Sequence, residues 1–211
     1  MSLALLASGS GSNVQALLDA AAAGTLPQVA LVLANVPCRA LERAAQAGVP
    51  SQLLPQQDYH SREAFDAALA QSVRDAGADL VCLAGFLRLL TPTFLGAFPG
   101  RVLNIHPSLL PAFPGLHAQR QALAAGVRLA GCSVHFVDPG TDTGALIAQA
   151  AVPVLPGDDE QALSARILNA EHRLYPAAAG WVAQGHVWLE AGRALFAPHL
   201  TAAGALHSPA A

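Results

Sequence analysis

The chain has 211 residues, a formal net charge of -3 at pH 7 and only 12% charged residues. This length is enough for one domain that buries a core without disulfides or metals. The charge balance lacks the basic excess of nucleic-acid-binding proteins, so we expect no nucleic-acid partner. The three cysteines are far apart and form no CxxC pair, which argues against a disulfide framework and a zinc site.

The sequence shows no export or membrane signal. The apolar run at residues 3–7 has no basic flank and is too short for the core of a signal peptide. Charged residues, glycine or proline interrupt every apolar run before it reaches the roughly 18 residues of a membrane helix. We therefore expect a cytoplasmic protein with no membrane contact.

The chain begins with a pattern typical of strand, glycine turn and helix. Residues 3–7 are apolar, residues 8–13 read Ser-Gly-Ser-Gly-Ser-Asn, and apolar residues at helical spacing occupy 14–21. The first N–H groups of such a helix can bind an anion, helped by the helix dipole. The turn lacks a P-loop lysine and the third glycine of a dinucleotide fingerprint, so a monophosphate suits it best. Alternatively, the glycines only make a tight turn and Ser12 or Asn13 caps the helix.

Strands and helices alternate through the first half of the chain. Apolar runs predict strands at 29–34, 51–54, 79–84 and 102–105, and helical spacing predicts helices at 39–47 and 61–77. Such alternation is typical of an α/β fold: a mostly parallel, twisted, Rossmann-like sheet with helices on both faces.

The pattern changes after residue 106. We expect an ordered loop at 107–115, a short helix at 117–125, and two strands at 132–137 and 145–154 that add an antiparallel hairpin. A long helix then begins at Asp158 and Asp159, and Pro176 should kink or break it. A small hairpin within 187–196 and a frayed end over the last ten residues complete the prediction.

The candidate chemistry lies where the strand ending in Leu103-Asn104-Ile105-His106-Pro107 stops. Asn104 and His106 are two residues apart and share one face of the strand, at its carboxyl end, where open α/β sheets bind ligands. A histidine moves protons near neutral pH, and a carboxylate such as Asp142 stabilises its charged form. Together these three residues can polarise a carbonyl and stabilise the adduct that an attacking amine forms. Singly, each side chain can equally satisfy loop backbone groups or an Asx turn.

These motifs carry a resemblance to a known family. The turn at 8–13, Leu83-Ala84-Gly85-Phe86-Leu87-Arg88, the run Asn104 to Pro111, and Asp142 with Gly144 occur in order and at similar spacing in folate-dependent formyltransferases. Over residues 1–189 the chain resembles the phosphoribosylglycinamide formyltransferase family. That resemblance implies transfer of a formyl group from 10-formyltetrahydrofolate, as co-substrate, to the amine of glycinamide ribonucleotide in purine biosynthesis, without a metal.

The resemblance also implies a role for each matching residue. Asn104, His106 and Asp142 would be catalytic, Glu171 would contact the substrate, and His135 would support the trio. The substrate phosphate would bind at Gly11, Ser12 and Asn13. The folate would contact Arg62, Leu87, Arg88, Leu89, Leu90, Asn104, Asp138, Pro139, Gly140, Thr141 and Asp142.

We expect one formyltransferase domain over 1–211, with a phosphate-binding half at 1–100, a catalytic and folate-binding half at 101–190 and a tail at 191–211. The resemblance allows a monomer or a homodimer. A formyltetrahydrofolate hydrolase shares the catalytic trio, but usually carries an extra N-terminal domain; a methionyl-tRNA formyltransferase needs a basic face. A non-catalytic module that binds a phosphometabolite or folate is the alternative of another class.

Overall fold

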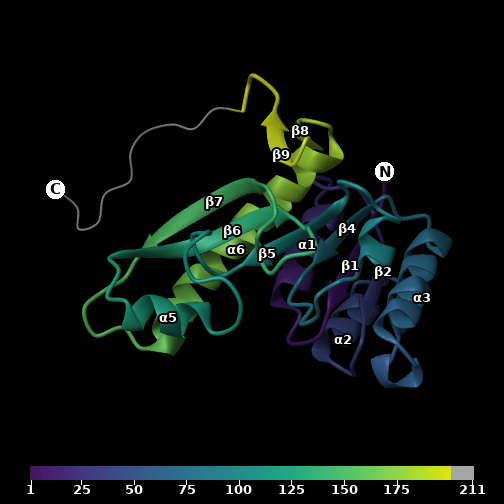
Figure 1. Ribbon diagram of the computed structural model, residues 1–211, viewed down its shortest axis with the longest axis horizontal. Helices are drawn as coiled ribbons and strands as arrows, with labels where there is room; N and C mark the ends of the chain where they lie inside the picture. The colour runs from purple at the N-terminus through teal and green to yellow at the C-terminus, as the bar shows by residue number, and fades with distance from the viewer. Residues whose placement is uncertain (201–211) are drawn as a thin grey trace.

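The computed structural model describes residues 1–200 and contains a seven-stranded sheet (Figure 1). The strand order is β3-β2-β1-β4-β5-β6-β7. The strands are β1 Leu3–Ala7, β2 Val29–Ala34, β3 Ser51–Leu53, β4 Leu80–Leu83, β5 Val102–His106, β6 Leu129–Phe136 and β7 Leu146–Pro153. The first five strands in this order, β3, β2, β1, β4 and β5, pair in parallel, whereas β6 runs antiparallel to both β5 and β7. The predicted α/β class, the parallel first half and the antiparallel addition are confirmed.

Helices cover both faces of this sheet. The helices are α1 Ser12–Ala22, α2 Arg39–Gln46, α3 Arg62–Asp75, α4 Pro92–Leu95, α5 Ala118–Ala124 and α6 Glu160–Ala183, with the 3-10 turn η1 at Gln56–Asp58. One apolar core joins the sheet to α1, α2 and α6, and a second joins it to α3 and α4. Because both faces are covered, all five residues of β1 are buried. In Figure 1 the long β6 and β7 extend away from α3, and α5 lies at their far end.

The strand order reverses between β1 and β4. The chain leaves β1 toward β2 on one side and leaves β4 toward β5 on the other, so the loops after β1 and β4 diverge. A reversal of this kind opens a crevice at the carboxyl ends of the strands. Ser8 N–H donates to the Gly85 carbonyl at 3.0 Å, which joins the two loops at the base of that crevice.

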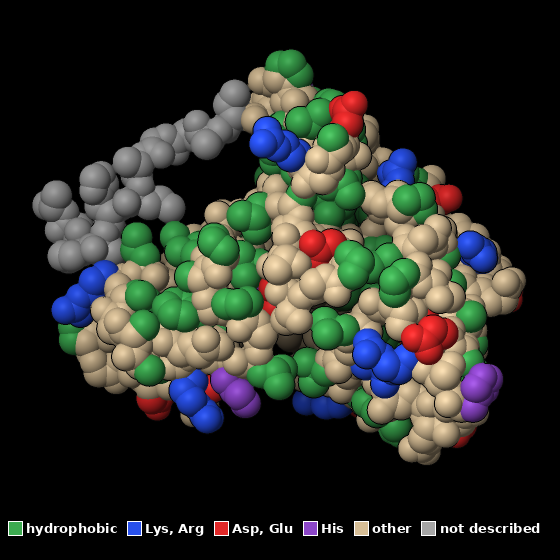
Figure 2. Space-filling view, viewed as in Figure 1, with side chains coloured by type: hydrophobic (Ala, Val, Ile, Leu, Met, Phe, Trp, Pro, Cys, Tyr) green, Lys and Arg blue, Asp and Glu red, His purple; other side chains and the backbone are tan. Residues whose placement is uncertain are grey.

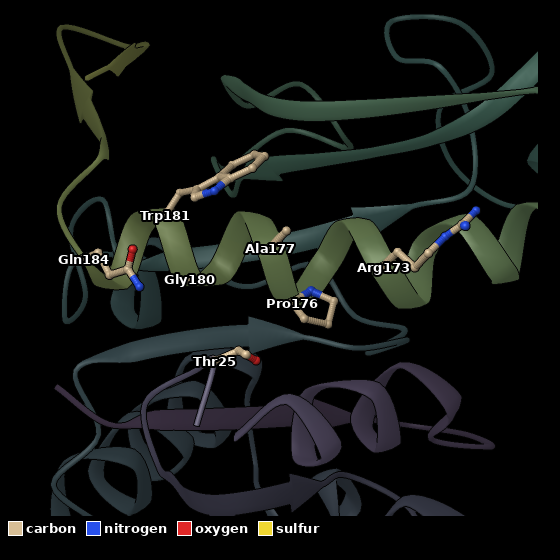
Figure 3. A pocket seen from close by; sticks show the side chains of 7 residues that line it. All are labelled: Thr25, Arg173, Pro176, Ala177, Gly180, Trp181 and Gln184. Atoms are coloured by element: carbon tan, nitrogen blue, oxygen red, sulfur yellow. The ribbon is translucent and has the colours of Figure 1, made fainter. Parts of the chain in front are cut away.

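Pro176 was expected to kink or break the last long helix, and the break is wrong. Figure 3 shows α6 continuing through Pro176, as its bounds also require. Proline removes one backbone hydrogen bond from a helix interior. Buried residues on both sides of it, including Ile167 and Val182, pack α6 onto the sheet and offset that loss. Pro176 lines a shallow hollow of about 320 Å³ beside Thr25 and Trp181, so its ring meets open space.

The end of the described chain forms the expected small hairpin, β8 Val187–Glu190 with β9 Arg193–Phe196. The expectation of a frayed end for the last ten residues lies outside the described residues. Within residues 1–200, every helix is too short or too polar to cross a lipid bilayer. The basic residues of the chain are all arginine, and on the face in Figure 2 they are scattered rather than gathered.

Candidate active site

The glycine turn after β1 leaves the first turn of α1 open to a ligand. Helix α1 begins after Gly11, which has φ 70° and ψ 25°, and no side chain caps its N-terminal N–H groups. Gly11 is required twice over, because a Cβ there would lie 2.7 Å from the Ala40 Cα and because the left-handed region disfavours other residues. The alternative that Ser12 or Asn13 caps the helix is therefore wrong. Unsatisfied N–H groups at a helix start are suited to an anion.

Asn13 turns its amide to Glu171 on α6 instead. Its Nδ2 donates to the Glu171 Oε2 at 2.7 Å, and its Oδ1 has no hydrogen-bond partner among the described residues. Glu171 is 6% exposed. Burial raises the pKa of this carboxyl, and the hydrogen bond from Asn13 opposes the rise only in part. The pair thus places a buried carboxyl and an unpaired amide oxygen beside the anion turn.

Asn104, His106 and Asp142 meet in the described structure. His106 Nδ1 lies 3.3 Å from Asp142 Oδ2, and Asn104 Nδ2 lies 3.4 Å from Asp142 Oδ1. Strand β5 supplies the first two residues, and the loop between β6 and β7 supplies Asp142 with a left-handed backbone at φ 54°. Asp138 holds that loop, because its carboxylate accepts hydrogen bonds from Gly140 N–H at 3.1 Å and the Thr143 hydroxyl at 2.8 Å.

His135 completes the cluster from the neighbouring strand. It pairs with Asn104 in the β5–β6 register, and its Nε2 lies 3.2 Å from Asn104 Nδ2 and 3.6 Å from Asp142 Oδ1. The Phe136 carbonyl lies 2.9 Å from His135 Nδ1 and fixes this nitrogen as the donor. The ring orientation of His135 therefore follows from the backbone next to it.

The Asp142 carboxyl is held in its charged form. Burial alone would raise its pKa, but the His135 ring beside it, the hydrogen bond from Gly115 N–H and the nearness of His106 outweigh burial and lower it. The Gly115 N–H donates to Asp142 Oδ2 at 2.8 Å. This carboxylate lies 3.3 Å from His106 Nδ1, where it can accept a hydrogen bond from that ring nitrogen.

The loop after β5 occupies the other side of the His106 ring. The Phe113 carbonyl lies 2.9 Å from His106 Nε2, opposite the nitrogen that faces Asp142. Both ring nitrogens thus face acceptors, and only the doubly protonated ring can donate to both. A developing oxyanion that replaced the Phe113 carbonyl would receive the same hydrogen bond.

These groups line a cleft of about 740 Å³ at the strand-order reversal. Of the expected site residues, it is lined by Ser12, Asn13, Leu87, Arg88, Leu89, Leu90, Asn104, His106, His135, Asp138, Gly140, Thr141, Asp142 and Glu171. Three of them, Gly11, Arg62 and Pro139, do not line it. The Arg62 guanidinium instead donates to the Leu89 carbonyl at 2.7 Å.

Sequence reasoning missed several residues that line the cleft. Ser164 and Leu168 precede Glu171 on α6 at i, i+4 and i+7, so they share its face, and helical spacing could have found them. Ser10, Leu116, His117 and Gln119 also line the cleft. Gln119 lies in α5, His117 directly precedes that helix, and Ser10 and Leu116 lie in loops, where no spacing indicates which residues face a ligand. Across residues 1–200, no group of three histidine, cysteine or acidic residues is arranged to hold a metal.

Comparison with known proteins adds independent evidence on the family. The model of the Formyl transferase family matches residues 1–179. The phosphoribosylglycinamide formyltransferase of Mycobacterium tuberculosis is 50% identical over 176 residues, which is 83% of this chain and 82% of that protein. The trifunctional purine biosynthetic protein adenosine-3 of Drosophila melanogaster is 52% identical over 187 residues, or 87% of this chain. The match spans only 14% of the length of that larger protein.

The fold agrees with the sequence comparison. The crystal structure of glycinamide ribonucleotide transformylase 1 from Symbiobacterium toebii superposes with a TM-score of 0.91 at 52% identity, and the match covers 93% of this chain and 94% of that one. The family model covers most of the chain, and the similarity holds in both sequence and structure. The chain therefore belongs to the Formyl transferase family.

Proposed function

We propose that the protein transfers the formyl group of 10-formyltetrahydrofolate to the primary amine of glycinamide ribonucleotide, in purine biosynthesis. The observation that carries this proposal is the meeting of Asn104, His106 and Asp142 in one cleft with an uncapped helix start. The names of the relatives point to the same reaction. Free cysteines at positions 38, 82 and 132 suit the reducing cytoplasm that we propose as its location.

The ribonucleotide would bind by its phosphate at the start of α1. The N–H groups of Ser12 and Asn13 follow Gly11, and neither has a side-chain cap in competition for it. Glu171 lies beside them at the wall of the cleft and would accept hydrogen bonds from the amine-bearing end of the substrate. These contacts would leave the amine directed toward β5.

The formyl donor would occupy the other half of the cleft. Residues 87–90 form one wall, and residues 138 and 140–142 form a second one. Leu87 is 72% exposed and Leu89 is 49% exposed, so both offer apolar surface to a flat heterocycle and its aromatic linker. We propose Pro139 as a support of the second wall, and Arg62 as a residue that the glutamate end of the folate can reach.

The trio would then act on the formyl carbon. The substrate amine nitrogen forms a bond to this carbon, and the formyl oxygen gains the negative charge that His106 Nε2 and an Asn104 N–H stabilise. Asn104 can release an N–H for this purpose, since its contact with Asp142 is long at 3.4 Å. As the adduct collapses, the bond to N10 of the folate breaks and the leaving nitrogen takes a proton from His106. The amine loses a proton to water or to the neutral imidazole.

The test is formyl loss from 10-formyl-5,8-dideazafolate, followed by absorbance with and without glycinamide ribonucleotide. We expect loss that requires the ribonucleotide, and a decrease of orders of magnitude in the His106→Ala variant. Equal loss without the ribonucleotide would assign the chain to a hydrolase instead. No loss under either condition would leave a binding module.

A further inference from the structure

The segment at residues 87–91, whose first four residues form one wall of the cleft, is irregular, yet its backbone is held at every second residue. Leu87 N–H donates to the Ser8 hydroxyl at 3.1 Å. The Leu89 carbonyl accepts from Arg62 at 2.7 Å, and Thr91 N–H donates to the Asp66 carboxylate at 2.6 Å. We call residues 87–91 the donor strip. Three side chains thus fix its path from the side away from the cleft.

Most of this support comes from one face of α3. Arg62, Phe65 and Asp66 stand at i, i+3 and i+4, which brings them to the same side of the helix. The Arg88 guanidinium lies 4.8 Å from the centroid of the Phe65 ring and also hydrogen-bonds the side chain of Gln56. The start of α3 therefore contacts the strip at three of its five residues.

Asp66 is the least expected member of that face. It is 1% exposed and lies among the apolar residues of the core between α3 and the sheet, next to Phe65 and Leu69. A carboxyl group in such a place costs free energy unless a partner satisfies it, and within residues 1–200 its one hydrogen-bond partner is the backbone of the strip. Packing alone would be served better by an apolar side chain. The hydrogen bond that Asp66 accepts from Thr91 N–H gives a reason for a carboxylate at this buried position.

We propose that Asp66 is a positioning residue for the formyl donor, acting through Thr91 N–H on the donor strip. The inference deepens the proposed function and rests on it. Because residues 87, 89 and 91 are already held by hydrogen bonds, the donor strip is ordered before the formyl donor binds. Binding then does not have to pay the entropy cost of ordering a loop. The anion turn does not depend on α3, so the ribonucleotide should bind without Asp66.

The experiment measures the binding of each ligand separately by calorimetry, with 10-formyl-5,8-dideazafolate and glycinamide ribonucleotide as the probes. For Asp66→Ala we expect donor affinity to fall about tenfold, and ribonucleotide affinity to change by less than about twofold. Asp66→Asn keeps an oxygen acceptor for Thr91 N–H and should recover most of the donor affinity. Asp75→Ala is the matched control, since Asp75 lies on the exposed face of α3 and its carboxylate accepts a hydrogen bond from the Gln71 side chain rather than from the strip; it should change neither affinity.

A second variant keeps the test decisive if Asp66→Ala does not fold. Arg62→Met removes the Leu89 hydrogen bond from an exposed helix position, and we expect the same selective loss of donor affinity. A donor analogue without its glutamate separates this effect from recognition of the tail, because a positioning role predicts that the loss persists with the shortened analogue.

Two results would overturn the proposal. Equal weakening of both ligands by Asp66→Ala would indicate a role in the whole fold, and unchanged donor affinity would show that the strip does not need Asp66. Hydrogen exchange at Thr91 N–H gives an independent readout, and it should accelerate in Asp66→Ala. If the unaltered protein binds no donor while this exchange still accelerates, the proposed function fails although Asp66 holds the strip.

Discussion

Replacement of Asp142 by asparagine removes one charge from the centre of the site and leaves its shape almost unchanged. The side-chain oxygen of the introduced asparagine can still accept the Gly115 N–H that now lies 2.8 Å from Asp142 Oδ2. What disappears is the carboxylate charge 3.3 Å from His106 Nδ1 and 3.6 Å from His135 Nε2. The substitution therefore tests electrostatics rather than packing.

The size of the effect follows from the distance. A unit charge 3.3 Å from an imidazolium is worth about 5 kcal/mol at an effective dielectric constant of about 20. The amide dipole of asparagine returns part of this attraction, so we expect a net loss of about 3 kcal/mol in stabilising the charged His106. At about 1.4 kcal/mol for each tenfold change, kcat should fall about a hundredfold.

The assay is the ribonucleotide-dependent loss of the formyl group, measured over a range of donor and ribonucleotide concentrations. We expect a lower kcat with ribonucleotide KM changed less than about threefold, because the anion turn is untouched. Asp75→Asn is the matched control. A variant within about fivefold of the original kcat would refute the reasoning, since it would mean that Asp142 does not stabilise the charged histidine.

Three further predictions concern the surrounding structure. Gly11→Ala forces a Cβ to 2.7 Å from the Ala40 Cα at a left-handed residue, so ribonucleotide KM should rise at least about tenfold in steady-state assays while donor KM stays constant. Tyr175→Phe removes a buried hydroxyl whose single hydrogen is shared between two strand carbonyls, and should destabilise by about 1–3 kcal/mol in urea unfolding, whereas Tyr59→Phe should cost less than about 0.5 kcal/mol. Glu171 has a raised pKa in the fold, so it contributes stability at low pH that is lost as the pH rises through that value; thermal melts of Glu171→Gln should lack this part of the pH dependence.

Local patterns predicted the elements of this fold well, because each pattern lies within a few neighbouring residues. The glycine turn before α1 and the helix predicted from residue 61 are examples. In the structure Ser61 caps that helix by accepting a hydrogen bond from Ala64 N–H at 3.0 Å. Pro176 misled the prediction, since packing along α6 outweighs the loss of one backbone hydrogen bond. The position of a proline in the sequence does not indicate how much of the surrounding helix is buried.

Contacts between distant segments were not predictable in the same way. The Thr91–Asp66 hydrogen bond joins residues 25 positions apart, and the Gly115–Asp142 bond joins residues 27 apart, each between a side chain and a backbone group. Any residue type except proline can supply a backbone N–H, so nothing in the letters of the sequence marks these partners. The hydrophobic periodicity of the sequence predicts the fold class, whereas the side chain–backbone contacts that support the site are seen only in the three-dimensional structure.

The left-handed backbone of Asp142 lowers the stability of the fold, while the Asp142 side chain is needed for the proposed chemistry. An L-residue at φ 54° is strained by roughly 1 kcal/mol, and glycine would relieve that strain. A laboratory selection for heat resistance alone would therefore tend to exchange this aspartate for glycine or asparagine, and would return a more stable protein without the carboxylate beside His106. Engineering of this chain should keep position 142 fixed and look for stability elsewhere, such as the exposed edge strand β3.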